Sequence, residues 1–152
     1  YCWFVTPHIA GHSVEGKVRG TQMIYEQICH RTGQKAPKAL SDFLESIPPI
    51  KVPLQHPTQT RLSVDDLIEV FHRIYDIAVD DIAMRQSVKR VENADTHAHG
   101  ESVALQFAAL RKQYRVRREC SAHTLVVPHN TSEEIAKTLK NLGFSVQREQ
   151  AQ

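Results

Sequence analysis

The sequence lacks the features of an extracellular or membrane-spanning protein. It contains three cysteines, an odd number with no CxxC spacing, which favours neither a disulfide framework nor a zinc knuckle. Its apolar runs, such as residues 1–5, are far shorter than the roughly 18 residues of a membrane-spanning helix. No basic start followed by a long apolar core indicates a signal peptide. We therefore expect a reducing compartment and a cytoplasmic location.

Neither sign of charge dominates. The chain has 19 Lys and Arg against 17 Asp and Glu, a formal net charge of +2. This balance favours neither nucleic acid nor a membrane as a partner, and we expect neither. A content of 41% hydrophobic and 24% charged residues in 152 residues is typical of globular proteins and leaves room for one domain with little beside it.

Residues 1–60 predict a short strand, a helix and a proline-rich linker, in that order. Residues 1–12 are mostly apolar and predict a short buried strand that runs into a turn. A helix is predicted between a Ser13 cap and a Gly33 stop. Its apolar face is expected at Val14, Val18, Thr21, Tyr25 and Ile28. Residues 34–60 hold five of the seven prolines and predict a linker with a short helical piece near residues 39–46. The alternating segment 50–54 follows, and Pro53 confines it to an edge or an end of a sheet.

The remaining residues predict an α+β unit. A capping box at Ser63 and Asp66 begins a helix that continues to Ile82, and a second helix covers about residues 102–115. Strands are predicted at residues 123–127 and 144–148, with a helix between them that is capped by Thr131 and Glu134 and stopped at Gly143. The expected organisation is a first part at 1–33, a linker at 34–45 and a unit of about three strands and three helices at 46–152.

The best candidate for chemistry is His8, in the string TPHIAG between the predicted strand and helix. Open α/β sheets bind their ligands at the carboxyl ends of strands. An imidazole there can act as a general acid or base, because its ordinary pKa lies near neutrality. A lone histidine is nevertheless more often structural, so position alone leaves both interpretations open.

The string TPHIAG resembles the active-site signature of the D-isomer-specific 2-hydroxyacid dehydrogenases. Segments further along are similar to one branch of that family, which has its own C-terminal dimerisation domain; they are HSVEGKVRGTQMIYEQICHRTG, LSVDDLIEVFHRIYDIAVDDIAMRQ, FAALRKQYRVRRECSAHTLVV and LGFSV. The resemblance implies that His8 is the catalytic proton donor, that Gly11 lies against the cofactor NAD, and that His12 binds the substrate, a phosphorylated hydroxy acid. It also implies a homodimer, with residues 1–33 as the last strand and following helix of a truncated α/β Rossmann-type dehydrogenase.

Several parts of such an enzyme are missing. The six glycines form no GxGxxG turn, which a nicotinamide enzyme needs to bring backbone amides to the pyrophosphate. The catalytic Arg and Glu of the family lie upstream of its His, whereas the seven residues before His8 include no acidic residue. We therefore expect the chain to be the C-terminal portion of the enzyme and inactive alone. The alternative is a free-standing homodimerisation module without catalysis.

Two further clusters carry hypotheses. The basic run comprises Arg111, Lys112, Arg115, Arg117 and Arg118. It is either a phosphate-binding surface, since Arg holds phosphate in a bidentate fashion, or the solvated end of a helix. His97 and His99 are the nearest approach to a metal site, but two loop histidines without a neighbouring Cys or carboxylate are poor evidence for one. No metal is predicted.

Overall fold

The computed structural model describes residues 2–92, 99–115 and 117–150, which fall into two compact units. We call Ser13–Tyr75 with Arg117–Gln152 the sheet unit, and Tyr1–His12 with Asp76–Val116 the helical unit. The expected parts 1–33, 34–45 and 46–152 concern the domains of a longer protein and stay a prediction. The α+β class is confirmed, with three strands as predicted.

The sheet unit is built on three parallel strands in the order β1-β2-β3. They are β1 (Ile50–Lys51), β2 (Thr124–Val127) and β3 (Ser145–Arg148). The register places Ile50, Leu125 and Val146 side by side in one row. The short β1 lies at an edge of the sheet, as Pro53 predicts, because a proline two residues further on cannot donate to a ladder.

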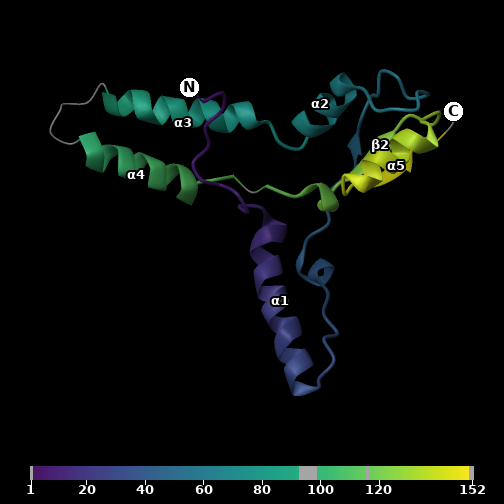
Figure 1. Cartoon of the computed structure of the whole chain (residues 1–152), viewed down its shortest axis with the longest axis horizontal. Coiled ribbons are helices and arrows are strands. Elements are labelled where there is room, and N and C mark those ends of the chain that lie inside the picture. The colour runs from purple at the N-terminus through teal and green to yellow at the C-terminus, as the bar shows by residue number, and fades with distance from the viewer. Residues whose placement is uncertain (1, 93–98, 116, 151–152) are drawn as a thin grey trace. The chain divides into compact units, whose positions relative to one another are not determined.

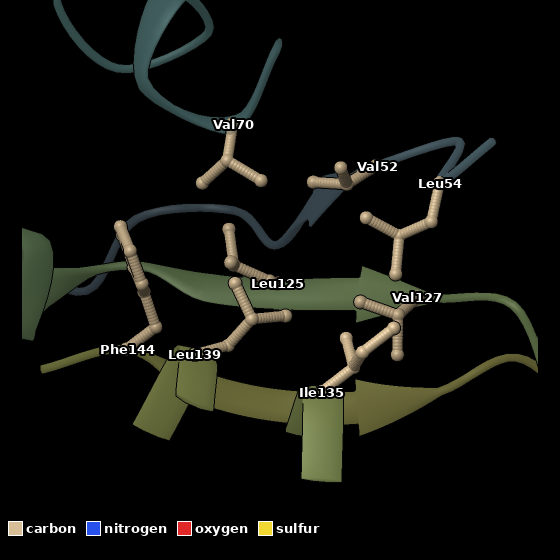
Figure 2. Close-up of a cluster of buried hydrophobic side chains, with 8 residues drawn as sticks. All are labelled: Val52, Leu54, Val70, Leu125, Val127, Ile135, Leu139 and Phe144. Atoms are coloured by element: carbon tan, nitrogen blue, oxygen red, sulfur yellow. The ribbon is translucent and has the colours of Figure 1, made fainter. Parts of the chain in front are cut away.

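The core of the sheet unit lies on one face of the sheet (Figure 2). Helices α2 (Val64–His72) and α5 (Glu133–Asn141) contribute apolar side chains to it. The buried members are Val52, Leu54, Val70, Leu125, Val127, Ile135, Leu139 and Phe144. Leu125 and Val127 alternate along β2, so the period of two that predicted the strand also selects its core face.

Both ends of α5 have well-defined caps. The Oγ of Ser132 accepts the N–H of Ile135, so the N-cap is Ser132 rather than the predicted Thr131. At the other end Gly143 has φ +100°, and the N–H of Phe144 returns to the Leu139 carbonyl. The predicted Gly143–Phe144 stop is therefore confirmed, and it carries Phe144 into the core.

Helix α1 (Val14–Thr32) begins after Ser13 and ends at Gly33 as predicted, but it buries another face. Its buried residues are Glu15, Gln22 and Cys29, whereas Met23, Ile24 and Ile28 are exposed. The polar members of the buried face have partners: Glu15 binds Arg118, and the Gln22 amide donates to the Lys38 carbonyl. The segment that returns along α1 contains the predicted short helical piece, a 3-10 turn at Leu40–Phe43 (η1, Figure 1).

The helical unit contains α3 (Ile77–Glu92) and α4 (His99–Lys112), which lie side by side (Figure 1). The sequence predicted one helix from Ser63 to Ile82, and this is wrong, because the chain breaks after His72 and restarts at Ile77. The Oδ1 of Asp76 accepts the Ala78 N–H at 2.9 Å, so this residue caps a new helix instead of continuing the old one. Residues 46–152 therefore contain four described helices rather than three.

The strand predicted at the start of the chain is not formed over residues 2–5. Trp3 is 91% exposed and Phe4 is half exposed, so this apolar segment is not buried either. A strand needs a neighbour that accepts its N–H groups, and here the Val5 N–H goes to the side chain of Asp81. Among the described residues, no helix has the length and apolarity that crossing a membrane requires.

Candidate functional site

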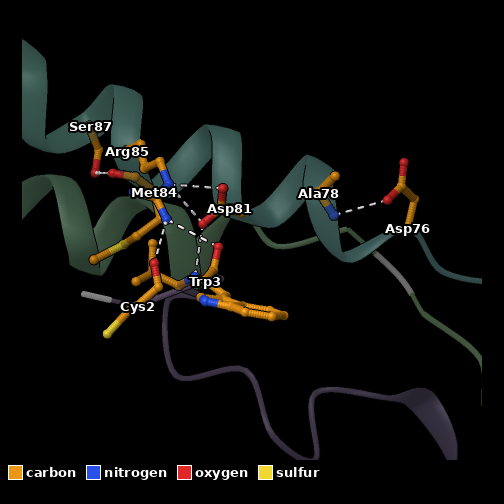
Figure 3. A network of polar contacts seen from close by, with 9 residues as sticks. Cys2, Trp3, Asp76, Ala78, Asp81, Met84, Arg85 and Ser87 are labelled. Carbon is orange, nitrogen blue, oxygen red and sulfur yellow. Dashed lines mark hydrogen bonds and ion pairs between the residues drawn. The ribbon is translucent and has the colours of Figure 1, made fainter.

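Residues 2–5, which precede His8, are bound to α3 by the ion pair of Asp81 and Arg85, which lie one helical turn apart (Figure 3). The Oδ1 of Asp81 accepts the Val5 N–H at 2.8 Å. The Nη2 of Arg85 donates to the carbonyls of Cys2 and Trp3 at 3.2 and 3.3 Å, and its Nε pairs with Asp81 at 2.9 Å. The hydrogen bond from Arg85, followed by that from the Val5 N–H, holds the pKa of Asp81 below its usual value. Backbone groups that a sheet would satisfy are thus satisfied by an ion pair.

Two consecutive turns then present the histidine. The His8 N–H donates to the Thr6 carbonyl at 2.9 Å, and the His12 N–H donates to the Ile9 carbonyl at the same distance. Ile9 is buried between them and anchors the loop. Gly11 occupies the third position of the second turn with φ +73°, a value that L side chains rarely adopt.

His8 is exposed and has a φ of +55°, the left-handed region. It is the one non-glycine residue with positive φ in the described part of the chain. Such a conformation costs about 1–3 kcal/mol in general and is concentrated at functional sites. Its ring makes no hydrogen bond to a described residue, so the imidazole can reach a small molecule from solvent. No described carboxylate orients it.

Gly11 and His12 lie on the same five-residue loop but differ in their surroundings. A Cβ added at Gly11 would meet no described atom within 4 Å, so its backbone is open to a planar group. His12 is half-buried, and its ring meets the ring of Tyr114 edge to face with centroids 6.0 Å apart. The Tyr114 hydroxyl in turn donates to the Oδ2 of Asp80 at 2.7 Å. The loop therefore carries all three predicted site residues, and one of them, His12, is packed against Tyr114.

The basic run is divided between the two units, and four of its five members contact a described residue. Arg111 lies over the Phe107 ring and Arg115 donates to the Asp76 carbonyl, all within the helical unit. In the sheet unit Arg117 lies 4.8 Å from the centroid of the Tyr75 ring. Arg118 is in an ion pair with Glu15. At least this last member has a structural role, which neither of the two hypotheses for the run included.

Sequence reasoning missed the residues that position the loop. Asp81 and Arg85 are spaced i, i+4 on α3, so the sequence indicates an ion pair along one helix. It does not indicate that this pair forms hydrogen bonds with residues 2–5. Among the side chains that the structure describes, no three His, Cys, Asp or Glu residues are grouped to hold a metal. His97 lies outside the described residues, and His99 begins α4.

Comparison with known proteins gives relatives that share one name. Erythronate-4-phosphate dehydrogenase of Salinibacter ruber is 36% identical over 138 residues, which is 89% of this chain and 33% of that protein. The enzyme of the same name from Pseudoalteromonas translucida is 36% identical over 144 residues, 94% of this chain and 32% of its own. That of Acinetobacter baylyi is 39% identical over 120 residues, 78% of this chain and 29% of its own. The chain thus spans about a third of the length of these curated relatives.

The resemblance stated from the sequence is confirmed at this level, because these relatives are named as dehydrogenases and match most of the chain. A match over 94% of the chain also includes α1, which lies outside the family model. That model, described as a domain of unknown function (DUF3410), matches residues 49–143. Since it covers more than half of the residues, the chain belongs to the family of this domain, DUF3410.

Proposed function

We propose that this chain is the C-terminal portion of an NAD-dependent 4-phosphoerythronate dehydrogenase of pyridoxal 5'-phosphate biosynthesis. The parent enzyme oxidises 4-phospho-D-erythronate to 2-oxo-3-hydroxy-4-phosphobutanoate. The observation that carries the proposal is His8: an exposed imidazole in a strained backbone conformation, within a motif of this enzyme family, in a chain whose curated relatives bear that name.

In the parent enzyme His8 is the group that moves the proton. The neutral ring accepts the proton of the substrate hydroxyl on carbon 2, and the protonated ring returns it in the reverse direction. His12 donates a hydrogen bond to the substrate from its place against Tyr114. A carboxylate that orients His8 has to come from outside the described residues, which supply none.

NAD, when bound, supplies the hydride acceptor of such an oxidation. The residues present fit one edge of its site, because the open space above Gly11 admits a flat ring close to the backbone. They do not supply the glycine-rich turn for the pyrophosphate. The 152 residues alone are therefore inactive in this proposal, and residues 46–152 serve to pair two copies of the enzyme.

The test joins this chain to the N-terminal two thirds of the Salinibacter ruber relative and follows NADH formation with 4-phospho-D-erythronate. The joined protein is expected to turn over, and His8→Gln is expected to lower kcat by roughly 100-fold or more, the usual contribution of a general base. His129→Gln is the matched control, since His129 is an exposed histidine in the other unit. An active joined protein that is indifferent to His8→Gln would contradict the proposed role.

The alternative function is a free-standing homodimerisation module, which the apolar side chains left exposed on α3 and α4 favour. It predicts a concentration-dependent dimer in sedimentation equilibrium of the 152-residue chain. It also predicts that the joined protein described above gains no activity. A monomer at all concentrations would remove it.

A further inference from the structure

The sheet unit contains a pocket that the proposed reaction does not use. It has a volume of about 420 Å³, within the range of small-molecule sites. Its walls come from the first turns of α1, the 3-10 turn η1 and the 3-10 turn η2 (Cys120–Ala122). Its polar lining consists of Glu15, Arg19, Ser41, Ser46, Arg118 and Ser121.

One guanidinium of this pocket is held in a fixed orientation. The Nε of Arg118 donates to the Oε1 of Glu15 at 2.5 Å, and its Nη1 donates to the Glu45 carbonyl at 2.9 Å. The Arg118 side chain is 15% exposed and that of Glu15 only 2%. Its Nη2 makes no hydrogen bond to a described residue. A guanidinium that is already ordered loses little freedom when it binds an anion.

The negative charge of Glu15, the only carboxylate in the lining, is balanced by the positive charge of Arg118. Burial raises the pKa of Glu15, but hydrogen bonds from Arg118 and from backbone N–H groups outweigh burial and lower it, so the side chain is ionised at neutral pH. Its second oxygen accepts the Glu119 N–H at 2.9 Å. The neighbouring His123 adds no charge, because burial, and then Arg118, lowers its pKa below the ordinary value.

The charge that remains uncompensated is that of Arg19. This side chain lies one turn after Glu15 on the same face of α1 and is exposed. It makes no hydrogen bond or ion pair to a described residue. The hydroxyls of Ser41, Ser46 and Ser121 are likewise without a described partner. Two arginines and three serines thus line one small volume, and the charged residues of its lining sum to one net positive charge.

We propose that this pocket binds the phosphate of a small phosphomonoester, with Arg19 as the charged residue that determines affinity. A tetrahedral phosphate presents three strong acceptor oxygens, which suits the mixed set of guanidinium and hydroxyl donors better than a flat carboxylate does. Apolar lining from Leu40 and Leu44 accommodates a short carbon chain. The site belongs to the sheet unit alone, whereas His8 belongs to the helical unit, so the inference does not depend on the proposed reaction.

The experiment titrates the 152-residue chain at low salt with inorganic phosphate, glycerol 3-phosphate and 4-phospho-D-erythronate, using calorimetry and the amide NMR signals of Ser41 and Ser121. Low salt matters because an exposed charge such as that of Arg19 is screened at high ionic strength. Arg19→Gln is expected to weaken glycerol 3-phosphate binding roughly tenfold, the effect of one charged hydrogen bond. Arg31→Gln, an exposed arginine at the other end of α1, is expected to change it less than twofold.

No binding up to about 10 mM, or equal weakening by Arg19→Gln and Arg31→Gln, would overturn the proposal. The two sources of the phosphate give different results. Tenfold tighter binding of 4-phospho-D-erythronate than of glycerol 3-phosphate assigns the pocket to that hydroxy acid, and equal binding assigns it to small phosphomonoesters in general. Either result supports a phosphate site, provided that Arg19→Gln weakens it.

Discussion

The sheet unit and the helical unit differ in the number of apolar side chains that they bury. In the sheet unit α2 and α5 meet the strands over a cluster of eight buried apolar residues. Among the described residues of the helical unit, Ile9 is the one aliphatic side chain buried to the same degree. Its exposed aliphatic side chains are Ile77, Val79, Ile82, Val88, Val103 and Leu105. Polar contacts, those of Asp81 and Arg85 above all, fix the start of the chain there.

This difference has a physical consequence. Apolar burial contributes about 25 cal/mol per Å² and is the main source of folding stability, whereas exposed ion pairs contribute little. We therefore expect the sheet unit to unfold cooperatively and to dominate the stability of the chain. The candidate catalytic loop belongs to the helical unit, which buries fewer apolar side chains. We therefore expect contact with another protein surface to stabilise this unit more than the sheet unit.

The sharpest test of the comparison is truncation of a core side chain. Leu125 is fully buried at the centre of the sheet, and Leu125→Ala is expected to lower the free energy of unfolding by about 2–5 kcal/mol. The matched control is Leu105→Ala in α4, where the side chain is 67% exposed and the change is expected to stay within about 0.5 kcal/mol. Urea denaturation followed by circular dichroism measures both. Equal losses would show that the helical unit has a core as well.

The second test compares two ion pairs, one from each unit. Glu15→Gln leaves the partly buried Arg118 without its charge partner and is expected to cost about 2 kcal/mol, below the usual cost because Arg118 keeps the Glu45 carbonyl. Asp81→Asn removes the corresponding pair on α3, whose Arg85 side chain is 47% exposed, and is expected to change the overall unfolding curve much less. A larger loss from Asp81→Asn than from Glu15→Gln would reverse the comparison.

Local patterns in the sequence predicted most of the secondary structure. The caps at Ser13, Gly33 and Ser63, the alternation along β2 and the stop at Gly143 all depend on neighbours within a few residues, and all are confirmed. The break between α2 and α3 is also local, but the apolar period continues through it and conceals the capping role of Asp76. A pattern of period 3.6 locates a helical face without showing where a helix ends.

Contacts between distant residues could not be predicted in the same way. The face of α1 is decided by Glu15 and its partner 103 residues further along, so a buried carboxylate outweighs the apolar positions of the helix. The loop of the candidate site was found through its motif, since the string TPHIAG contains His8 and Gly11, and His12 follows it directly. Asp81 and Arg85, which hold the segment before that loop, lie 76 to 83 positions from the residues they bind and were missed.

The smallest expected effect concerns the acid sensitivity of the anchor itself. The pKa of Asp81 is lowered from its ordinary value of 3.8, chiefly by the hydrogen bond from Arg85 and then by the Val5 N–H. A lowered pKa means that the contact stabilises the folded segment above about pH 4 and is lost as the pH falls through the lowered value. Hydrogen exchange at the Val5 amide, corrected for the intrinsic rate, should therefore be slowed by a constant factor from neutrality to about pH 5, and by less below about pH 4.

Acid also affects the sheet unit, because the pKa of Glu15 is lowered too, so a decline at Val5 alone does not identify its cause. The variant Asp81→Asn separates the two contributions. It should remove the pH dependence of protection at Val5 while the protection of Leu125 in β2 keeps its own dependence. If Val5 in this variant still loses protection in step with Leu125, the segment before His8 follows the sheet unit rather than its anchor on α3, and the independence of the two units fails.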